Sequence, residues 1–533
     1  MRISYSIENL RRLRKTPEIE IRPITILVGR NSAGKSTFLR SLPLLRQSVE
    51  TRSSAPILWY GDYVDFGDFQ TAIGEANDDS EAAFVFSVTD IKGVQRSRAS
   101  YMGGYYRVRS PISAKKATVR YVIGSSGEKT KLRRIELSVP EEEIEFIASF
   151  EGRTFSENKL LIDGVEVHGW SNEYELLNLS TSLFSAPFFI KKLRDSHKPA
   201  RRFLYPDGVF SRALENTIRS KVARKLSDET IEREVRRILG AKAFDDATIT
   251  ALEAQTRTQT FKKIYRQILR EKNSFTEQIT AIRKAYRAFG FLEILDEELS
   301  EFFSGVGYLA PARAASERFY RKQELEVSEI DPNGGNFPMF LDSLSKSMFK
   351  DFSNWVQSIF GFGVELVSTR GHISINLKAG NRSVNVTDTG YGVSQVLPVM
   401  GVIWWAKNQP SSRRNPHLQS SSTRVLAIEQ PELHLHPAHQ AKLADVFAGA
   451  IAGEVGLRSR NDVSFVIETH SEALINRLGE LVEKGIVSAN DIQIVVFSAE
   501  DDIESPTKVS LAHFDKGGIL NNWPYGFFNY DQK

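Results

Sequence analysis

The stretch Gly29-Arg30-Asn31-Ser32-Ala33-Gly34-Lys35-Ser36-Thr37 fits the pattern G-x-x-x-x-G-K-[ST] of a phosphate-binding loop. An apolar run at 24–28 predicts a buried strand before it, and a helical pattern follows it. Backbone N–H groups of such a loop point at phosphate oxygens, and the helix N-terminus adds partial positive charge. Lys35 is expected to reach the β- and γ-phosphates and Ser36 to bind Mg²⁺. Residues 30–37 are therefore predicted to bind ATP.

Composition narrows the class of protein. A chain of 533 residues with 41% hydrophobic and 26% charged residues is typical of several globular folding units. No run approaches the ~18–20 apolar residues that span a bilayer, and no segment resembles a signal peptide. The absence of cysteine excludes disulfides, thiolate zinc sites and cysteine nucleophiles. These features predict a cytoplasmic protein with no membrane partner.

Positive charge is concentrated in the middle of the chain. Residues 191–290 contain 24 Lys and Arg against 12 Asp and Glu, a net charge of +12, so the rest of the chain sums to −8 from the total of +4. Such a segment indicates either a nucleic-acid or acidic-partner surface, or a solvated helical surface.

The hydrophobic patterns predict an α/β fold in three segments. Residues 1–185 are expected to form an N-terminal lobe with the phosphate loop and an antiparallel β portion, because 83–88, 117–123, 133–139 and 144–150 alternate as strands do. Residues 186–303 read as a basic helical insert, with helices at 223–239 and 261–289. Residues 304–533 form a C-terminal lobe, with a helix at 338–360 and an exposed loop at 410–423.

Three further stretches contain candidate catalytic and binding residues. An apolar strand at 425–428 ends in Glu429, followed by Gln430 and Glu432, and such a carboxylate (Walker B) belongs beside Mg²⁺. A second buried strand, at 464–467, is followed by Glu468 and His470. A glycine-rich turn contains Gly390, Gly392 and Ser394, and Ser394 is expected to cap a helix at 395–406, creating a second anion site.

Together these motifs resemble the ABC-type ATPase heads of SMC, RecF and OLD (overcoming lysogenization defect) proteins, whose core is a mixed sheet flanked by helices. The stretches that resemble OLD-like AAA ATPases of bacterial and phage-defence operons are 429–437 (EQPELHLHP), 468–471 (ETHS) and 519–528 (ILNNWPYGFF). The resemblance covers roughly residues 1–70 and 305–533.

The resemblance implies a homodimer, with ATP between the phosphate loop of one head and the signature turn of the other. Ser394, with Gly390 and Gly392, would contact the γ-phosphate bound by the partner head. His470 would sense the γ-phosphate, Glu429 would bind Mg²⁺, and Gln70 is the candidate Q-loop residue beside the metal.

One position departs from this pattern. In ABC-type heads a glutamate follows the Walker B carboxylate and orients the attacking water, whereas this chain has Gln430. An amide cannot act as a base, and Glu432 and Glu468 are the nearby carboxylates that could replace it. We therefore predict slow hydrolysis and a long-lived ATP-bound dimer.

His434, His436 and His439 raise the alternative of a zinc site. Their spacing does not place them on one helical face, and Pro437 interrupts it, so a loop is the favoured interpretation.

The resemblance also implies a separate effector chain. OLD proteins carry a TOPRIM nuclease after the ATPase, but too few residues follow 471–478 here for that domain. The expected function is a sensor in an anti-phage complex that controls an HNH nuclease, as in Septu, or a TOPRIM effector, as in PARIS. Nucleic acid is expected to bind through 191–290. The alternatives are a DNA-repair or chromosome-maintenance ATPase of SMC/RecF type and, disfavoured by the large insert, a transporter motor subunit.

Overall fold

The structure is a computed structural model in which the chain divides into two compact units. The first comprises Met1–Glu8, Arg52–Ile57 and Glu75–Ser300, and the second comprises Asn9–Thr51, Leu58–Gly74 and Glu301–Lys533. The residues described are 2–51, 53–73, 80–96, 99–101, 104–106, 109–127, 129–150, 157–171, 173–178, 182–192, 203–204, 206–222, 226–241, 244–271, 273–323, 327–408, 425–453, 462–498 and 506–523. The loop expected at 410–423 and the tail residues 524–528 lie outside them.

An antiparallel sheet forms the centre of the first unit. Its strands follow the order β12-β11-β10-β9-β8-β5-β1. Their bounds are β1 (Arg2–Leu10), β5 (Glu81–Arg96), β8 (Arg109–Ser126), β9 (Lys129–Val139), β10 (Ile144–Ser149), β11 (Lys159–Ile162) and β12 (Val165–Glu166). The four stretches predicted from alternation fall on β5, β8, β9 and β10, so the predicted antiparallel portion is confirmed.

Among the described residues of this unit, five helices accompany the sheet: α3 (Pro206–Lys221), α4 (Asp228–Gly240), α5 (Asp246–Gln255), α6 (Gln259–Arg270) and α7 (Ser274–Ser304). The short strands are β6 (Ala99–Tyr101), β7 (Gly104–Tyr106), β13 (Tyr174–Leu177), β14 (Phe188–Lys191) and β15 (Phe203–Leu204). The helix expected at 261–289 is divided between α6 and α7, because Asn273 Oδ1 accepts hydrogen bonds from the N–H groups of Phe275 and Thr276 and begins a new helix.

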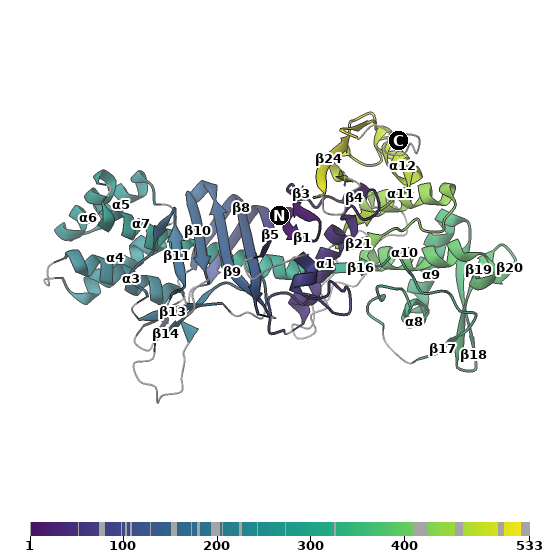
Figure 1. Cartoon of the computed structure of the whole chain (residues 1–533), viewed down its shortest axis with the longest axis horizontal. Coiled ribbons are helices and arrows are strands. Elements are labelled where there is room, and N and C mark those ends of the chain that lie inside the picture. Colours follow the sequence, from purple (N-terminus) through teal and green to yellow (C-terminus); the bar gives the residue numbers. More distant parts are fainter. Residues whose placement is uncertain are drawn as a thin grey trace. The chain divides into compact units, whose positions relative to one another are not determined.

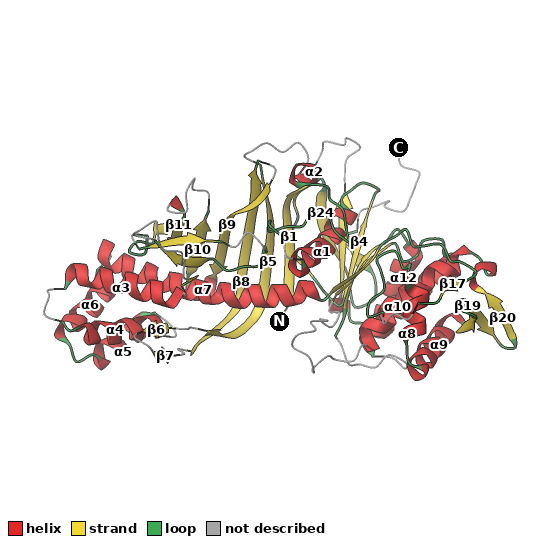
Figure 2. Ribbon diagram, turned by 90° about the horizontal axis from the view of Figure 1, so that it is seen from below, coloured by secondary structure: helices red, strands yellow, loops and turns green. Residues whose placement is uncertain are grey.

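Aromatic side chains join the sheet to these helices. α7 runs along one face of the sheet (Figure 2), and the ring of Phe289 on α7 contacts the ring of Phe146 on β10 edge to face, with 5.6 Å between their centroids. Phe289 also contacts Phe189 of β14 and Phe210 of α3, at 5.5 and 5.3 Å between ring centroids. Because these rings pack against one another, the apolar area that they bury stabilises both the sheet and the helices. The structure therefore groups the β portion with the helical segment, whereas the sequence placed a boundary at 185–186.

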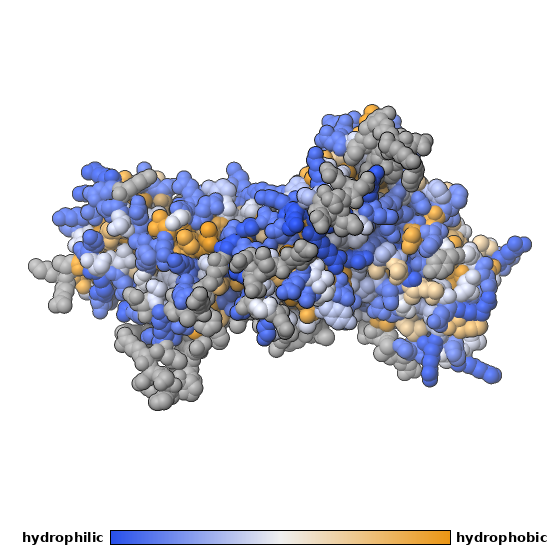
Figure 3. Space-filling model, in the orientation of Figure 1, coloured by the Kyte–Doolittle hydropathy of each residue, from blue (hydrophilic) through white to orange (hydrophobic). Residues whose placement is uncertain are grey.

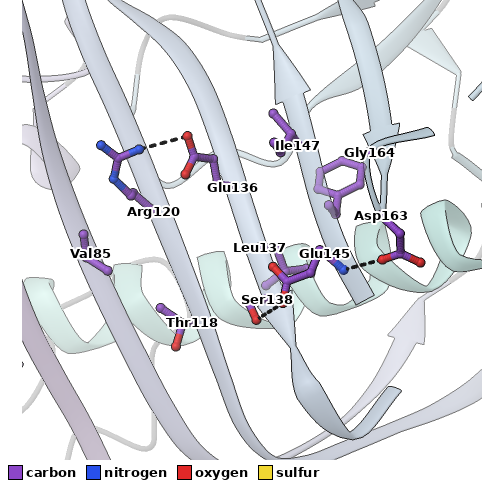
Figure 4. Close-up of a pocket in the computed structure, with 11 residues that line it drawn as sticks. Val85, Thr118, Arg120, Glu136, Leu137, Ser138, Glu145, Ile147, Asp163 and Gly164 are labelled. Atoms are coloured by element: carbon purple, nitrogen blue, oxygen red, sulfur yellow. Dashed lines mark hydrogen bonds and ion pairs between the residues drawn. The ribbon is translucent and has the colours of Figure 1, made fainter. Parts of the chain in front are cut away.

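The opposite face of this sheet contains a groove of about 520 Å³ (Figure 4). Arg120 and Glu136 lie in it as an ion pair, with 2.9 Å between Nη1 and Oε1. Ser138 donates a hydrogen bond to Glu145, whose backbone N–H donates to Asp163 at 3.0 Å. Because these charged groups pair with one another, the groove offers poor recognition of a polyphosphate.

A buried acid on α7, Asp296, gives the first unit a testable pH dependence. Asp296 accepts a hydrogen bond from the Tyr121 hydroxyl, and burial raises the pKa of Asp296 from 3.8 to about 7. A carboxyl group whose pKa is higher in the folded state favours folding while it is protonated. This contribution is complete below pH 3.8 and is lost as the pH rises through about 7.

We expect Asp296→Asn to remove this loss, which is on the order of 4 kcal/mol at about 1.4 kcal/mol per pKa unit. Urea unfolding at pH 5 and pH 8 measures it: the stability of the variant relative to the wild type should increase from pH 5 to pH 8, because the loss is partial at pH 5 and nearly complete at pH 8. Equal pH dependence in the two proteins would contradict the assignment.

A mixed sheet forms the core of the second unit, in the order β16-β21-β22-β4-β23-β24-β25. The strands are β16 (Val306–Leu309), β21 (Val425–Glu429), β22 (Ser464–Glu468), β4 (Ile24–Gly29), β23 (Ile492–Ser498), β24 (Lys508–Phe514) and β25 (Leu520–Asn521). β16 to β23 are parallel, and β24 and β25 are antiparallel. The carboxyl ends of β4, β21 and β22 therefore meet at one edge, the usual place for ligands in such sheets.

Helices flank this sheet, as Figure 1 shows for α1 and α10 to α12. The helices of the unit are α1 (Lys35–Glu50), α2 (Phe69–Ile73), α8 (Phe337–Ser343), α9 (Lys346–Phe360), α10 (Tyr391–Asn408), α11 (Pro437–Ala452) and α12 (Glu472–Glu483). The remaining strands are β2 (Leu13–Lys15), β3 (Ile19–Glu20), β17 (Tyr320–Arg321), β18 (Gly363–Thr369), β19 (His372–Ala379) and β20 (Arg382–Asn385). The predicted fold class, a mixed sheet flanked by helices with an antiparallel β portion, is confirmed.

The helix expected at 338–360 is divided in two. Ser345 lies between α8 and α9, and its hydroxyl accepts a hydrogen bond from the N–H of Met348 at 3.3 Å. A serine N-cap of this kind begins a new helix, which the hydrophobic pattern alone did not show.

Polar side chains cover most of the face seen in Figure 3, where apolar residues form small, separate groups. Within the described part of the chain, no helix combines the length and the apolar character needed to cross a membrane.

Candidate nucleotide site

The phosphate loop connects β4 to α1 in the second unit. A Cβ atom at Gly29 would lie 2.3 Å from the carbonyl oxygen of Phe497 on β23, so only glycine fits there. Gly34 has φ of 90° and directly precedes α1, where an L-residue would be strained. Both glycines of the motif are therefore required by the backbone itself.

Lys35 is enclosed by its own loop, with its side chain only 3% exposed. Its ammonium group donates hydrogen bonds to the carbonyl oxygens of Gly29 and Arg30, at 3.0 and 2.8 Å. Burial lowers the pKa of Lys35, and the nearby Glu468 carboxylate opposes that shift. The loop therefore presents a cation at its centre.

Ser36 faces a carboxylate from another strand. Its hydroxyl donates a hydrogen bond of 2.7 Å to Glu468 Oε2, and Glu468 Oε1 lies 3.7 Å from the Lys35 ammonium. Burial raises the pKa of Glu468 and the hydrogen bond from Ser36 lowers it. Glu468 is the last residue of β22, which pairs directly with β4.

Glu429 ends β21, one strand further from the loop, and both of its oxygens are occupied. Arg40 of α1 donates to Oε1 and Oε2 at 2.7 and 2.8 Å, and the Tyr308 hydroxyl donates to Oε1 at 2.8 Å. The Glu429 side chain is 2% exposed. The hydrogen bonds that Arg40 donates to Glu429 raise the pKa of Arg40, so the guanidinium keeps its charge.

The turn after β21 links the two strand ends. Gln430 has φ of 43°, and its N–H donates to the Glu468 carbonyl at 2.8 Å. Arg313 Nη2 donates to the carbonyls of Glu429 and Gln430 at 3.1 and 3.2 Å, and burial lowers the pKa of Arg313 to about 10. Glu432 accepts a 2.8 Å hydrogen bond from the backbone N–H of His470, and burial raises its pKa.

The signature turn differs from the prediction in one respect. α10 begins at Tyr391, so Ser394 lies inside its first turn and is 6% exposed, rather than capping a helix at 395. A Cβ at Gly392 would lie 2.4 Å from the carbonyl of His434, so this glycine lets α10 approach the loop after β21. Gly390 is exposed, with φ of 94°.

The other predicted residues are more dispersed. Arg30, Asn31 and Ser32 are exposed at the tip of the loop, while Ala33 and Thr37 are buried beneath it.

Gln70 lies exposed on α2 and makes none of the hydrogen bonds described around Ser36. The His470 side chain is exposed. His436 caps α11, since its Nδ1 accepts from the N–H of Ala438 at 3.3 Å, and His439 packs on Phe360.

Sequence reasoning missed three residues of this site: Arg40, Tyr308 and Arg313. Arg40 had a usable signal, because it follows Ser36 by four residues and so lies on the same face of α1. Nothing in the local sequence around Tyr308 or Arg313 indicates a partner near residue 429.

The side chains at this edge of the sheet suit the binding of Mg²⁺ and a polyphosphate. A serine hydroxyl and a carboxylate are the hard oxygen ligands that Mg²⁺ prefers, and it is commonly held by one or two carboxylates together with substrate phosphates. A lysine at a helix N-terminus provides the matching cation for phosphate oxygens.

The comparison with protein families agrees with this chemistry. Residues 1–475 match the family model of the AAA ATPase domain. An SMC head solved with the C-winged helix domain of ScpA aligns with TM-score 0.35 and 10% identity, covering 96% of this chain and 98% of that one. The SMC head domain from Thermotoga maritima aligns with TM-score 0.32 and 9% identity, over 96% of this chain and 98% of that one. No curated protein matches the chain.

Proposed function

The chain belongs to the AAA ATPase domain family, and we propose that it binds Mg-ATP at residues 30–37 and hydrolyses it slowly. The observation that supports this most directly is the enclosed Lys35 beside Ser36 and a buried carboxylate. Backbone N–H groups of the loop would hold phosphate oxygens, and Lys35 would turn from the loop carbonyls to the β- and γ-phosphates. Ser36 and a carboxylate at the strand ends would hold Mg²⁺, which offsets phosphate charge.

Slow turnover is proposed because Gln430 stands where a base is expected. The carboxylate of Glu432, two residues on, accepts a hydrogen bond from the His470 N–H and is therefore engaged in holding the turn. Steady-state phosphate release measures this. We expect Gln430→Glu to raise turnover at least about ten-fold, because a general base typically contributes 10²–10⁴-fold. Wild-type turnover on the order of tens per second would contradict the proposal.

We also propose that ATP joins two heads. Gly390, Gly392 and Ser394 would contact the γ-phosphate held by the partner head, and His470 would report its presence. The exposed Gly390 and the exposed His470 side chain are consistent with this arrangement. Light scattering with a non-hydrolysable ATP analogue tests this arrangement: the molar mass should be that of a dimer with the analogue and that of a monomer without the analogue.

The biological role we propose is that of a sensor in an anti-phage complex that controls a nuclease on a separate chain, of HNH or TOPRIM type. The support is the resemblance of 429–437 and 468–471 to OLD-like ATPases. A DNA-repair or chromosome-maintenance ATPase of SMC/RecF type is the second candidate, and the family match is equally compatible with it. Co-purification from the native operon separates them: a bound nuclease favours the first, and ATP-stimulated binding to DNA ends without a nuclease favours the second.

The nucleic-acid surface proposed within 191–290 can be narrowed to α6. Many cations of this segment are paired with carboxylates, among them Arg219 with Asp228 and Arg266 with Glu253. Lys263 and Arg270 lie exposed on α6, opposite its buried apolar face, and take part in no ion pair between described residues.

We expect Lys263→Glu/Arg270→Glu to weaken binding to duplex DNA at least about ten-fold at 150 mM salt, because lost phosphate contacts release fewer counterions. Fluorescence anisotropy against salt concentration measures both the affinity and its salt dependence. Lys378→Glu/Arg382→Glu, on exposed residues of β19 and β20, is the matched control for net charge. Equal losses in both variants would show that α6 has no special role.

A further inference from the structure

Two carboxylates end neighbouring strands at the nucleotide site, and the structure gives them different partners. Glu429 and Glu468 are register partners across the parallel pair β21 and β22. Two adjacent carboxylates repel each other when both are charged. A site of this kind is stable when at least one of the two is neutralised.

Glu429 is the neutralised member. The Arg40 guanidinium contacts both of its oxygens, in the bidentate geometry that makes the strongest charge-assisted pairs. Tyr308 adds a third hydrogen bond, so the carboxylate reaches three donors while it is almost fully buried. Binding a metal through Glu429 would require breaking these bonds.

Glu468 is oriented towards the loop. Its strand lies directly beside β4, and its carboxylate accepts a hydrogen bond from the Ser36 hydroxyl. Backbone hydrogen bonds fix Glu468 on both sides. The carbonyl of Glu468 accepts a hydrogen bond from the N–H of Gln430, and the N–H of the next residue, Thr469, donates to the carbonyl of Leu27 at 3.1 Å. The carboxylate is therefore positioned beside the residue that the motif assigns to the metal.

We propose that Glu468, rather than Glu429, is the carboxylate that holds Mg²⁺ together with Ser36, and that Glu429 is a structural partner of Arg40. This inference rests on the proposed binding of Mg-ATP. In this assignment the metal-binding carboxylate lies on β22, the strand between β21 (the Walker B strand) and β4 (the strand before the phosphate loop). Glu429 instead holds α1 against the sheet through Arg40.

The test measures the affinity of a fluorescent ATP analogue for the full chain with Mg²⁺ and with EDTA. For the wild type we expect Mg²⁺ to strengthen binding at least about ten-fold, since the metal bridges protein oxygens and phosphates. Glu468→Gln should abolish that enhancement, whereas Glu429→Gln should keep it. Glu472→Gln, on an exposed residue four positions after Glu468, is the matched control.

A second readout does not depend on nucleotide fluorescence. Electron paramagnetic resonance of Mn²⁺ added with ATP should show bound metal in the wild type and in Glu429→Gln, and free metal in Glu468→Gln. If Glu468→Gln proves unstable on thermal unfolding, Glu468→Asp, which keeps the charge on a shorter side chain, should weaken the metal enhancement while ATP still binds.

The outcomes separate the inference from the proposed function. Loss of metal enhancement in Glu429→Gln with retention in Glu468→Gln would overturn the inference and leave ATP binding intact. A wild-type chain that binds no ATP analogue, with or without Mg²⁺, would instead remove the proposed function.

Discussion

Lys35→Met is expected to abolish ATP binding. The Lys35 ammonium is enclosed by the loop and donates to two loop carbonyls, so it is already held where phosphate oxygens would replace those acceptors. Methionine keeps the apolar stem but removes the charge. Hydrogen bonds to charged groups contribute about 1.5–3 kcal/mol each, so we expect the dissociation constant for ATP to rise at least about 100-fold.

Isothermal titration calorimetry measures this loss, with Lys378→Met as the control for removal of one exposed lysine. The thermal midpoint of the variant should be recorded alongside, because Lys35 also lies 3.7 Å from Glu468. Wild-type affinity in a folded Lys35→Met variant would show that the loop does not bind the phosphates.

Arg40→Met is expected to have the largest effect on stability. Arg40 is the cation that neutralises Glu429, whose side chain is 2% exposed. Removing one partner of a buried ion pair leaves an uncompensated charge, which typically costs about 3–5 kcal/mol. Urea unfolding of the full chain, followed by tryptophan fluorescence, measures this, because the buried Trp355 and Trp404 both lie in the second unit.

A second substitution separates charge from packing. In Arg40→Met/Glu429→Gln the buried charge is gone and Tyr308 can still donate to the amide oxygen, so most of the lost stability should return. If the double variant is as unstable as the sum of the two single variants, Arg40 acts through packing and not through Glu429.

Local patterns predicted much of the second unit. The predicted strand at 24–28 and the helix after the loop appear as β4 and α1, because burial of a short apolar run and the start of a helix depend on adjacent residues. Glu429 and Glu468 both end strands, as their apolar runs indicated. The positions at which helices divide, at Asn273 and Ser345, were missed because a single capping residue decides them.

Local sequence patterns were enough to locate a phosphate loop after a buried strand, two further strands that end in carboxylates, and a basic segment in the middle of the chain. The loop and the two strands depend on residues that are adjacent in the sequence, and the basic charge is a count over one continuous segment. Folding of the whole chain brings the Glu468 carboxylate to Ser36 and the Arg40 guanidinium to Glu429, and Arg40 and Glu429 are 389 residues apart in the sequence. It also joins α7 and the antiparallel sheet in one aromatic core, and such packing between distant segments leaves no trace in local periodicity.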